Sequence, residues 1–439
     1  MAIQQIHTRF QHLLKHLGHK DILLNAAAML GSTFVTSGLG FVYWWAAAHL
    51  FTPRIVGLAS AYISAMSLIG PFGVLGLGTL LMGKLPTLRE KRGSYVVTSL
   101  LVSSIVAGLL GMGFAIIAPF ISKELAALAG NVWTVVLFGI GVSLAASTFV
   151  LDQAMIGLSM GGLQVTRNAA FSMFKLALLL VIAYLLKETN GLLIYATWQL
   201  SQVISIAVFM IWGRNKGVQP SRWREWRPRL SILRELPGPA LEHHALNMAL
   251  QITGLGLPVV VTSLLSAELN ASFYLAWLIV SFMVAVPLML SVALFASGSA
   301  DKAAFSSKIR ATLKLSLAAA VLANLVFWPG ADFVMGLFGR SYAHDAAGAL
   351  RILGLGIIPL VIKDHFIAAR RVYGVLKKTA LLAAVGGALE LGLAALGARW
   401  GGLQGLCLGW LIALCIEGLV TGPAVYRVVR NPSPLKRGL

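Results

Sequence analysis

Three stretches of the chain, each roughly 30 residues long, contain no Asp, Glu, Lys or Arg. They are residues 22–53, 93–122 and 269–300. Because a helix needs about 20 apolar residues to cross the hydrocarbon core of a bilayer, each stretch holds at least one membrane span. Backbone polar groups have no water partner in lipid, which leaves helices or a closed barrel, and the long apolar runs without alternation exclude a barrel. The sequence therefore predicts an all-α integral membrane protein.

The composition agrees with a chain embedded in lipid. Of the 439 residues, 58% are apolar and only 11% are charged, whereas a soluble domain is about a quarter charged. The first apolar run is much longer than the apolar core of a signal peptide, which has about 7–15 residues, so we interpret it as a retained helix. Twelve spans are predicted, at 23–47, 55–82, 95–121, 132–151, 168–186, 192–212, 243–265, 271–296, 312–330, 350–368, 379–397 and 403–426.

Lysine and arginine are distributed unevenly between the two sides that twelve spans define. With both termini on one side, 28 of the 35 basic residues lie on that side, 6 lie on the other, and Lys175 lies inside a span. Cytoplasmic loops carry such an excess, which predicts that both termini are cytoplasmic. The net charge of +20 then reflects short loops beside an anionic leaflet, and it implies no nucleic-acid partner.

The longest polar stretch divides the spans into two sets of six. Pro71 in the second span matches Pro287 in the eighth, and Tyr62 matches Trp277 at nearly the same offset. Because six is even, such a repeat would be related by an axis along the membrane normal. We predict a cytoplasmic amphipathic segment over 1–21, an N-terminal six-helix bundle over 22–212, a basic cytoplasmic linker over 213–241, a C-terminal six-helix bundle over 242–427 and a cytoplasmic tail over 428–439.

Four stretches carry a resemblance to a known family. They are 25–86, with Thr52-Pro53 and Lys84-Leu85-Pro86; 151–168, beginning Leu151-Asp152-Gln153-Ala154; 274–296, beginning Tyr274-Leu275-Ala276-Trp277; and 337–371, beginning Leu337-Phe338-Gly339-Arg340-Ser341-Tyr342. In this order they resemble the oligosaccharide-lipid flippases. These form the polysaccharide transporter branch of the superfamily that also holds the multidrug and toxin extrusion proteins.

This resemblance implies a fold and a function. The fold would be two pseudo-symmetric bundles around a central cavity, working by alternating access. The cargo would be a polyprenyl-pyrophosphate-linked glycan, moved from the cytoplasmic to the outer leaflet of the cell membrane for cell-surface polysaccharide biosynthesis. Membrane lipids and other polysaccharide-assembly membrane proteins would be its partners.

Lys175 is the first candidate binding residue, because ionisable groups at membrane depth usually face a cavity or a partner. Asn168 and Ser172 share its helix face, and Arg167 lies nearer the cytoplasmic end. A cationic stripe of this kind suits a pyrophosphate, since charge-assisted bonds to phosphate are strong. Alternatively, Lys175 extends to the headgroups or pairs with Asp152.

Polar residues also form stripes at helical spacing on four other spans. These stripes fit a hydrated cavity for a sugar-bearing cargo, and they equally fit hydrogen bonding between helices. The candidate residues are Asn25, Ser32, Thr36 and Tyr43 on the first span, Gln199 and Gln202 on the sixth, His244, Asn247 and Gln251 on the seventh, and Tyr274 and Trp277 on the eighth.

Three carboxylates are candidates for ion coupling. Asp152 ends the fourth span, Glu390 lies in the outer half of the eleventh and Glu417 in the cytoplasmic half of the twelfth. Each could bind and release a proton within the membrane. The alternative for Glu390 and Glu417 is a buried ion pair with Lys363 or Arg399.

Motifs for other chemistry do not occur in the sequence. No Gly-rich phosphate loop with Lys follows a strand, and no His/Cys cluster has the spacing of a metal site, so no cofactor or metal is expected. Two alternatives to a flippase remain. A cation-coupled small-molecule exporter of the same fold would need an acidic cavity. A membrane glycosyltransferase or ligase would need a larger outer loop than 331–349.

Overall fold

A computed structural model describes residues 36–430, apart from 87, 89–90, 159, 187–189, 216–226, 236–237 and 301–304. The predicted amphipathic segment 1–21, the candidates Asn25 and Ser32, and the tail beyond residue 430 lie outside the described residues. So does much of the predicted linker. The domain boundaries drawn from the sequence therefore stay predictions.

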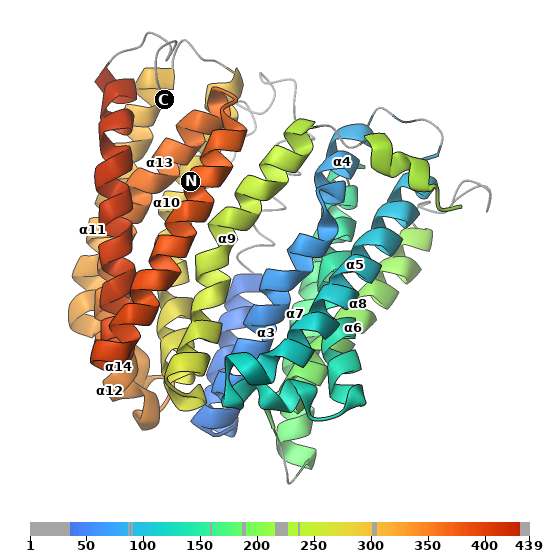
Figure 1. Ribbon diagram of the computed structural model, residues 1–439, viewed down its shortest axis with the longest axis horizontal. Coiled ribbons are helices and arrows are strands. Elements are labelled where there is room, and N and C mark those ends of the chain that lie inside the picture. Colours follow the sequence, from blue (N-terminus) through green and yellow to red (C-terminus); the bar gives the residue numbers. More distant parts are fainter. Residues whose placement is uncertain are drawn as a thin grey trace, which may run out of the picture.

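The described chain is helical and contains no strand (Figure 1). The first half comprises a helix over 36–50, α3 Pro53–Val74, α4 Leu77–Lys84, α5 Arg92–Ile121, η1 Lys123–Ala129, α6 Val132–Gly157, α7 Gly161–Leu185 and α8 Gly191–Asn215. The second half comprises η3 Leu230–Glu235, α9 Gly238–Leu264, α10 Ala267–Ala300, α11 Phe305–Gly336, α12 Arg340–Leu355, α13 Ile357–Val372 and α14 Leu376–Arg430. The predicted all-α class is confirmed.

Two breaks, one between α12 and α13 and one inside α14, explain how these helices correspond to the twelve predicted spans. Nine of the described helices are long and apolar enough to cross a membrane, and α12 with α13 forms a tenth span bent by 41°. The 55 residues of α14 would measure about 80 Å as one straight helix, which is far more than a bilayer core of about 30 Å. Non-helical backbone at Gly401 and Gly402 divides α14 into two arms. Counted with the helix over 36–50, the two arms of α14 bring the candidate spans of the described chain to the predicted twelve.

The two arms of α14 form a hairpin because glycines let them approach closely. Gly402 has a φ of 56°, in the left-handed region that glycine adopts readily. A Cβ on Gly397 would lie 2.0 Å from the carbonyl oxygen of Gly405, so no larger residue fits there. The backbones of the two arms are therefore in direct contact.

The two halves lie side by side and meet along α3. In Figure 1, α5 to α8 lie on one side and α10 to α14 on the other, with α3 and α9 between them. Helix α3 packs against α9 and α10 of the second half. Within each half, chain neighbours pack together, as α5 with α6 and α13 with α14, and α9, the first long helix of the second half, also packs against α14, the last. This arrangement agrees with the predicted two bundles.

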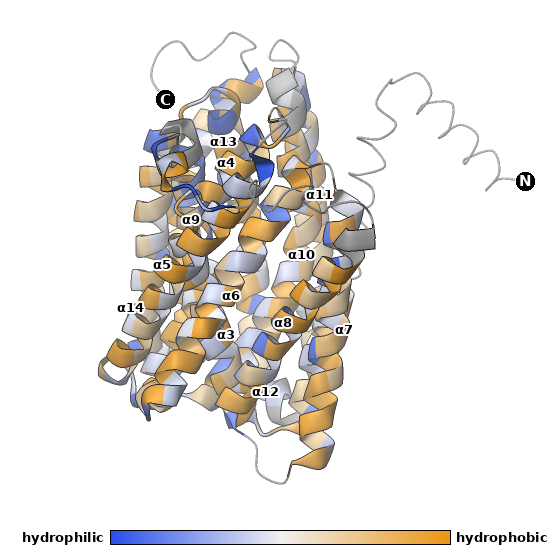
Figure 2. Ribbon diagram, turned by 90° about the vertical axis from the view of Figure 1, so that its right-hand side faces the viewer, coloured by the Kyte–Doolittle hydropathy of each residue, from blue (hydrophilic) through white to orange (hydrophobic). Residues whose placement is uncertain are grey.

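Apolar side chains cover the long sides of the bundle. On α11, Leu322, Leu325 and Phe333 are 63%, 68% and 74% exposed, and Figure 2 shows mainly apolar colours along the helices, with hydrophilic residues gathered toward one end. An apolar surface this extensive requires lipid rather than water around it. The chain is a multi-pass membrane protein.

Candidate functional site

Two adjacent cavities lie between the halves. The larger has a volume of about 340 Å³ and the smaller about 200 Å³, and both are lined by Ser67 of α3 and Leu255 of α9. The larger cavity is lined mainly by the first half: Met66, Ser67, Pro71, Ala145, Thr148, Phe149, Asp152, Arg167, Asn168, Phe171, Trp198 and Gln202, with Gln251 and Leu255 from α9. The smaller is lined by Ile63, Ser64, Ser67, Gly254, Leu255, Tyr274, Trp277, Leu278 and Ser281.

An ion pair lies on the wall of the larger cavity. Arg167 is buried and its Nη2 donates to both carboxylate oxygens of Asp152, at 2.7 and 2.8 Å. The same nitrogen donates to Oδ1 of Asn168 at 2.6 Å. The partner of Asp152 is thus Arg167 rather than Lys175. The two opposite charges cancel, so this part of the wall is polar but has no net charge.

Lys175 lies one layer behind the wall, enclosed by aromatic rings. Its side chain is buried, and its Nζ lies 4.3 Å from the centre of the Trp198 ring, 5.1 Å from Phe171 and 5.2 Å from Tyr43. Aromatic faces attract a cation, more strongly where water is excluded. No described carboxylate pairs with Lys175, so its charge is balanced by ring faces alone. It neither faces lipid nor pairs with Asp152.

An aromatic cluster connects this lysine to the second half. We define the aromatic wall as Tyr43, Trp44, Phe171, Trp198 and Tyr274. Trp198 contacts Tyr43 and Phe171, while Trp44 lies between Trp198 and Tyr274 of α10. Sequence reasoning missed Trp44, Phe171 and Trp198, because aromatic residues in an apolar span give no signal that separates a cavity wall from a lipid face.

Amide side chains complete the lining. Gln202 borders the larger cavity from α8, and Gln199 of the same helix has its Nε2 2.9 Å from Sδ of Met66. The Oε1 atoms of both glutamines are buried and have no hydrogen-bond partner among the described residues. From the facing helix, Gln251 lines the cavity and donates to the carbonyl oxygen of Asn247. These groups could hydrogen-bond to sugar hydroxyls.

The remaining candidates lie in several places. Tyr274 and Trp277 line the smaller cavity, and His244 approaches the backbone of Pro71. Ser172 and Tyr43 are buried and line neither cavity. Thr36 is half-buried and also lines neither. The assignment of all these residues to cargo binding stays a prediction.

A charged cluster occupies the second half. Nζ of Lys363 lies 2.5 Å from Oε1 of Glu390 and 2.8 Å from Oε2 of Glu417, and Nε1 of Trp410 donates to Glu390 at 2.8 Å. The sequence placed the two glutamates in opposite halves of the bilayer. They meet at one lysine because the two arms of α14 run antiparallel from Gly401–Gly402. The cluster is a buried ion pair with an extra carboxylate, and its role in ion coupling stays a prediction.

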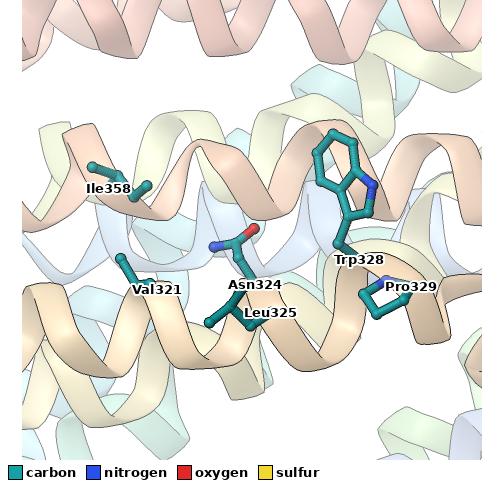
Figure 3. Close-up of a pocket in the computed structure, with 6 residues that line it drawn as sticks. All are labelled: Val321, Asn324, Leu325, Trp328, Pro329 and Ile358. Atoms are coloured by element: carbon teal, nitrogen blue, oxygen red, sulfur yellow. The ribbon is translucent and has the colours of Figure 1, made fainter.

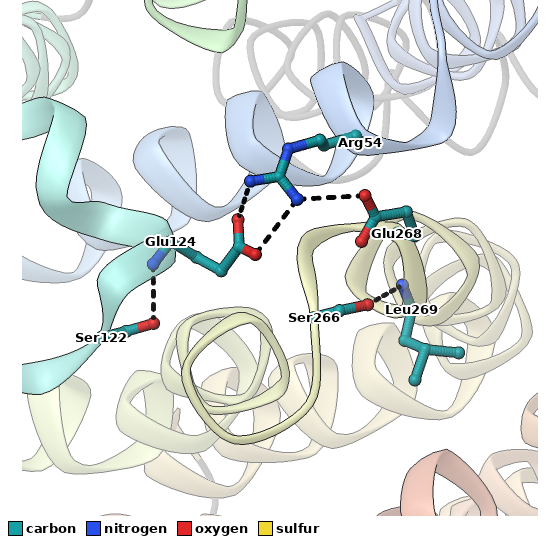
Figure 4. A network of polar contacts seen from close by, with 6 residues as sticks. All are labelled: Arg54, Ser122, Glu124, Ser266, Glu268 and Leu269. Carbon is teal, nitrogen blue, oxygen red and sulfur yellow. Dashed lines mark hydrogen bonds and ion pairs between the residues drawn. The ribbon is translucent and has the colours of Figure 1, made fainter.

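The halves are linked at the end opposite to Asp152. Arg54 of α3 contacts Glu124 of η1 at 2.8 Å and Glu268 of α10 at 3.2 Å (Figure 4). One turn further along, Nδ2 of Asn270 donates to the carbonyl oxygen of Gly57 and to Oγ of Ser60. These contacts join α3 to α10 at this end, which is the predicted outer side.

A separate crevice lies away from the interface between the halves. It has a volume of about 350 Å³ between α11 and α13 and is lined by Val321, Asn324, Leu325, Trp328, Pro329 and Ile358 (Figure 3). Its one amide, Asn324, donates to the carbonyl oxygens of Ala320 and Gly354. The crevice is therefore an apolar groove on a lipid-facing surface and is not part of the central cavities. The described residues contain no group of His, Cys, Asp and Glu side chains that could hold a metal ion.

Comparison with known proteins identifies the fold. The sequence matches no protein-family model and no curated protein. A multidrug resistance MATE family transporter of the MOP superfamily, in an inward-facing conformation, superposes with a TM-score of 0.69 at 16% identity, over 91% of this chain and 96% of that one. The chain has the fold of MATE transporters.

Two further structures refine the comparison. An outward-facing MATE transporter of the MOP superfamily gives a TM-score of 0.60 at 16% identity, covering 94% of this chain and 97% of that one. A point mutant of a Vibrio cholerae MATE transporter gives 0.61 at the same identity and coverage.

Proposed function

We propose that this protein is an alternating-access exporter, held here in a state that is closed on the outer side. Three observations support this. The fold is that of transporters, the cavities lie between the two halves, and the contacts of Arg54 and Asn270 link α3 to α10 at the predicted outer end. The predicted location is the cell membrane with both termini in the cytoplasm.

We propose further that the cargo is an anionic glycolipid, of which a polyprenyl-pyrophosphate-linked oligosaccharide is the expected form. The observation that carries this is the charge of the site. Among the described residues, Asp152 is the only carboxylate that lines the two central cavities, and it is already neutralised by Arg167, whereas Lys175 behind the aromatic wall has no described carboxylate partner. A site with this balance favours anions and disfavours cations.

The neighbouring amides and rings suit the glycan. The unpaired Oε1 atoms of Gln199 and Gln202 can accept hydrogen bonds from hydroxyl groups, and the polyprenyl tail would remain in the bilayer while the head crosses between the halves. Other membrane proteins of polysaccharide assembly are the expected partners.

A second candidate is a cation-coupled multidrug exporter. The solved structures favour it, since the similar proteins are described as multidrug resistance transporters. It would require a cavity that attracts cationic compounds, and Asp152 would have to release Arg167 to provide one. The fold likeness supports both candidates, so the cavity charge and a transport assay must separate them.

The test is leaflet transfer in vesicles that contain the purified protein. A fluorescent oligosaccharide on a short polyprenyl pyrophosphate is placed in the leaflet on the cytoplasmic face, and a membrane-impermeant quencher reports its arrival on the other face. The same glycan on an uncharged lipid and a lipophilic cationic dye are the comparison cargoes. We expect transfer of the pyrophosphate lipid alone.

Variants of Lys175 connect this assay to the site. We expect Lys175→Gln to lower transfer about tenfold or more, because a charge-assisted contact is lost, and Lys175→Arg to retain part of it. Lys314→Gln, an exposed lysine on α11, is the control for net charge. Efflux of the dye without transfer of the glycolipid would overturn the anionic cargo and favour the second candidate.

A further inference from the structure

Arg371, at the end of α13, has an unusual set of contacts. Its Nη2 donates to Oδ1 of Asn247 at 2.7 Å, and its guanidinium lies 5.9 Å from the centre of the Phe295 ring. Its Nε is buried and has no hydrogen-bond partner among the described residues. A guanidinium has five N–H donors; Asn247 takes one of them and the Nε–H is enclosed by protein, so the donors left for a ligand are those of the two Nη atoms.

The face of α9 that Arg371 contacts borders the larger cavity. Asn247 shares that face with His244 and Gln251, at three- and four-residue spacing. Gln251 lines the cavity, and His244 approaches the backbone of Pro71, which also lines it. Arg371 therefore lies at the margin of the cavity, and at the end predicted to be cytoplasmic because α13 ends and α9 begins there.

Neighbouring charges do not cancel that of Arg371. Asp364 is two helical turns earlier on α13 and His243 is on α9, and both are near enough to interact with the guanidinium electrostatically. No described carboxylate, however, lies within ion-pair distance of Arg371. An arginine beside a cavity that has no carboxylate at ion-pair distance is typical of a phosphate site.

The adjacent arginine, Arg370, has contacts that are typical of a structural role. Arg370 is buried, its Nε donates to Oγ1 of Thr379 at 2.7 Å, and its guanidinium lies over the ring of Phe366. Arg370 thus joins α13 to α14 within the second half. Arg371 extends instead toward α9 and the cavity.

We propose that Arg371 is the first binding group for the phosphate of the cargo, at the predicted cytoplasmic mouth of the cavity. This inference rests on the proposed function. It adds a phosphate-binding group in the second half, Arg371, to Lys175 in the first half. The planar guanidinium of Arg371 binds phosphate oxygens in a bidentate manner. Asn247 is a positioning residue that holds this guanidinium at the cavity margin. The phosphate passes from Arg371 toward Lys175 as the halves close around it.

The experiment measures the concentration dependence of leaflet transfer with the fluorescent polyprenyl-pyrophosphate oligosaccharide. We expect Arg371→Gln to raise the half-saturating concentration about 10- to 100-fold, the range for losing a hydrogen bond to a charged group. The maximal rate should change much less. Asn247→Ala should raise the half-saturating concentration less than Arg371→Gln does, and Arg371→Lys should restore part of the affinity.

Controls separate binding from folding and from net charge. Lys378→Gln removes an exposed positive charge at the same end of the protein and should leave the half-saturating concentration unchanged. Every variant is compared with the wild type by its elution profile and unfolding midpoint in detergent. Binding of inorganic pyrophosphate to the detergent-solubilised protein gives a second readout, and it should weaken with Arg371→Gln but not with Lys378→Gln.

The two proposals fail in different ways. If the wild-type protein transfers no pyrophosphate lipid, the proposed function is wrong. If the wild type transfers it and folded Arg371→Gln keeps the same half-saturating concentration, the transport function stands and the role of Arg371 is overturned.

Discussion

Trp44 of the first half contacts Tyr274 of the second half, with ring centroids 4.6 Å apart and an interplanar angle of 57°. Trp44 also faces Trp198, whose ring lies beside Nζ of Lys175. Tyr274 in turn lines the smaller cavity. A continuous aromatic path therefore leads from the buried lysine to the interface between the halves, so a movement of α10 relative to the first half must alter the surroundings of Lys175.

The first prediction concerns this contact. Trp44→Ala should lower the stability of the protein by about 3–5 kcal/mol, because a buried large aromatic side chain is removed from a packed interface. Trp44→Phe should cost clearly less. The unfolding midpoint in detergent measures both changes. Trp133→Ala is the matched control, since that side chain is 79% exposed and should have little effect; equal losses for Trp44→Ala and Trp133→Ala would contradict the role of Trp44.

The second prediction concerns the link between halves at the predicted outer end. Glu268→Gln removes the contact of Arg54 with α10, whereas Glu124→Gln removes its contact within the first half. Exposed ion pairs contribute only about 0–1 kcal/mol, so neither variant should unfold the protein. Glu268→Gln should nevertheless shift the protein toward the outward-open state, since it weakens a contact that exists only when this end is closed.

Cysteine labelling measures this shift. Ser64 lines the smaller cavity, so Ser64→Cys should react faster with a membrane-impermeant thiol reagent from the outer side when Glu268→Gln is present. Cys407 is buried and Cys415 is exposed, so Cys415→Ser is included in every variant. Equal acceleration by Glu124→Gln would show that the effect comes from charge loss rather than from opening between the halves.

Sequence reasoning succeeded where the signal was local. Hydrocarbon thickness and loop charge act on each segment separately, so the twelve spans could be predicted, including a break in α14 between residues 397 and 403. These properties depend on composition along the chain and not on how helices turn toward one another.

Partners across helices could not be predicted in the same way. Asp152 pairs with Arg167 rather than Lys175, and the sequence left both Lys363 and Arg399 open as partners of Glu390 and Glu417, because small differences in helix rotation and level decide which long side chains touch. Trp44, Phe171 and Trp198 of the aromatic wall were missed for a related reason. Trp44 and Trp198 have the same apolar character as side chains that face lipid, so only packing shows that they enclose a cation.

The third prediction concerns the cluster around Lys363. Lys363→Met should lower stability by about 3–5 kcal/mol, because removing one partner leaves buried carboxylates without compensation. Adding Glu390→Gln should recover part of that loss, since one negative charge is then removed as well. The unfolding midpoints of the single and double variants give the comparison. If Lys363→Met is as stable as the wild type, the cluster does not need its lysine.

The fourth prediction concerns the close approach of α3 and α10. A Cβ on Gly57 would lie 1.6 Å from the carbonyl oxygen of Ala267, so Gly57→Ala forces the two helices apart at the closed end. We expect it to open the outer end, as measured by labelling of Ser64→Cys, more strongly than Glu268→Gln does, because a steric clash cannot be relieved by solvent. Gly392→Ala is the matched control, since a Cβ there would meet nothing within 4 Å. Unchanged labelling in a folded Gly57→Ala variant would mean that α3 and α10 are not the elements that close this end.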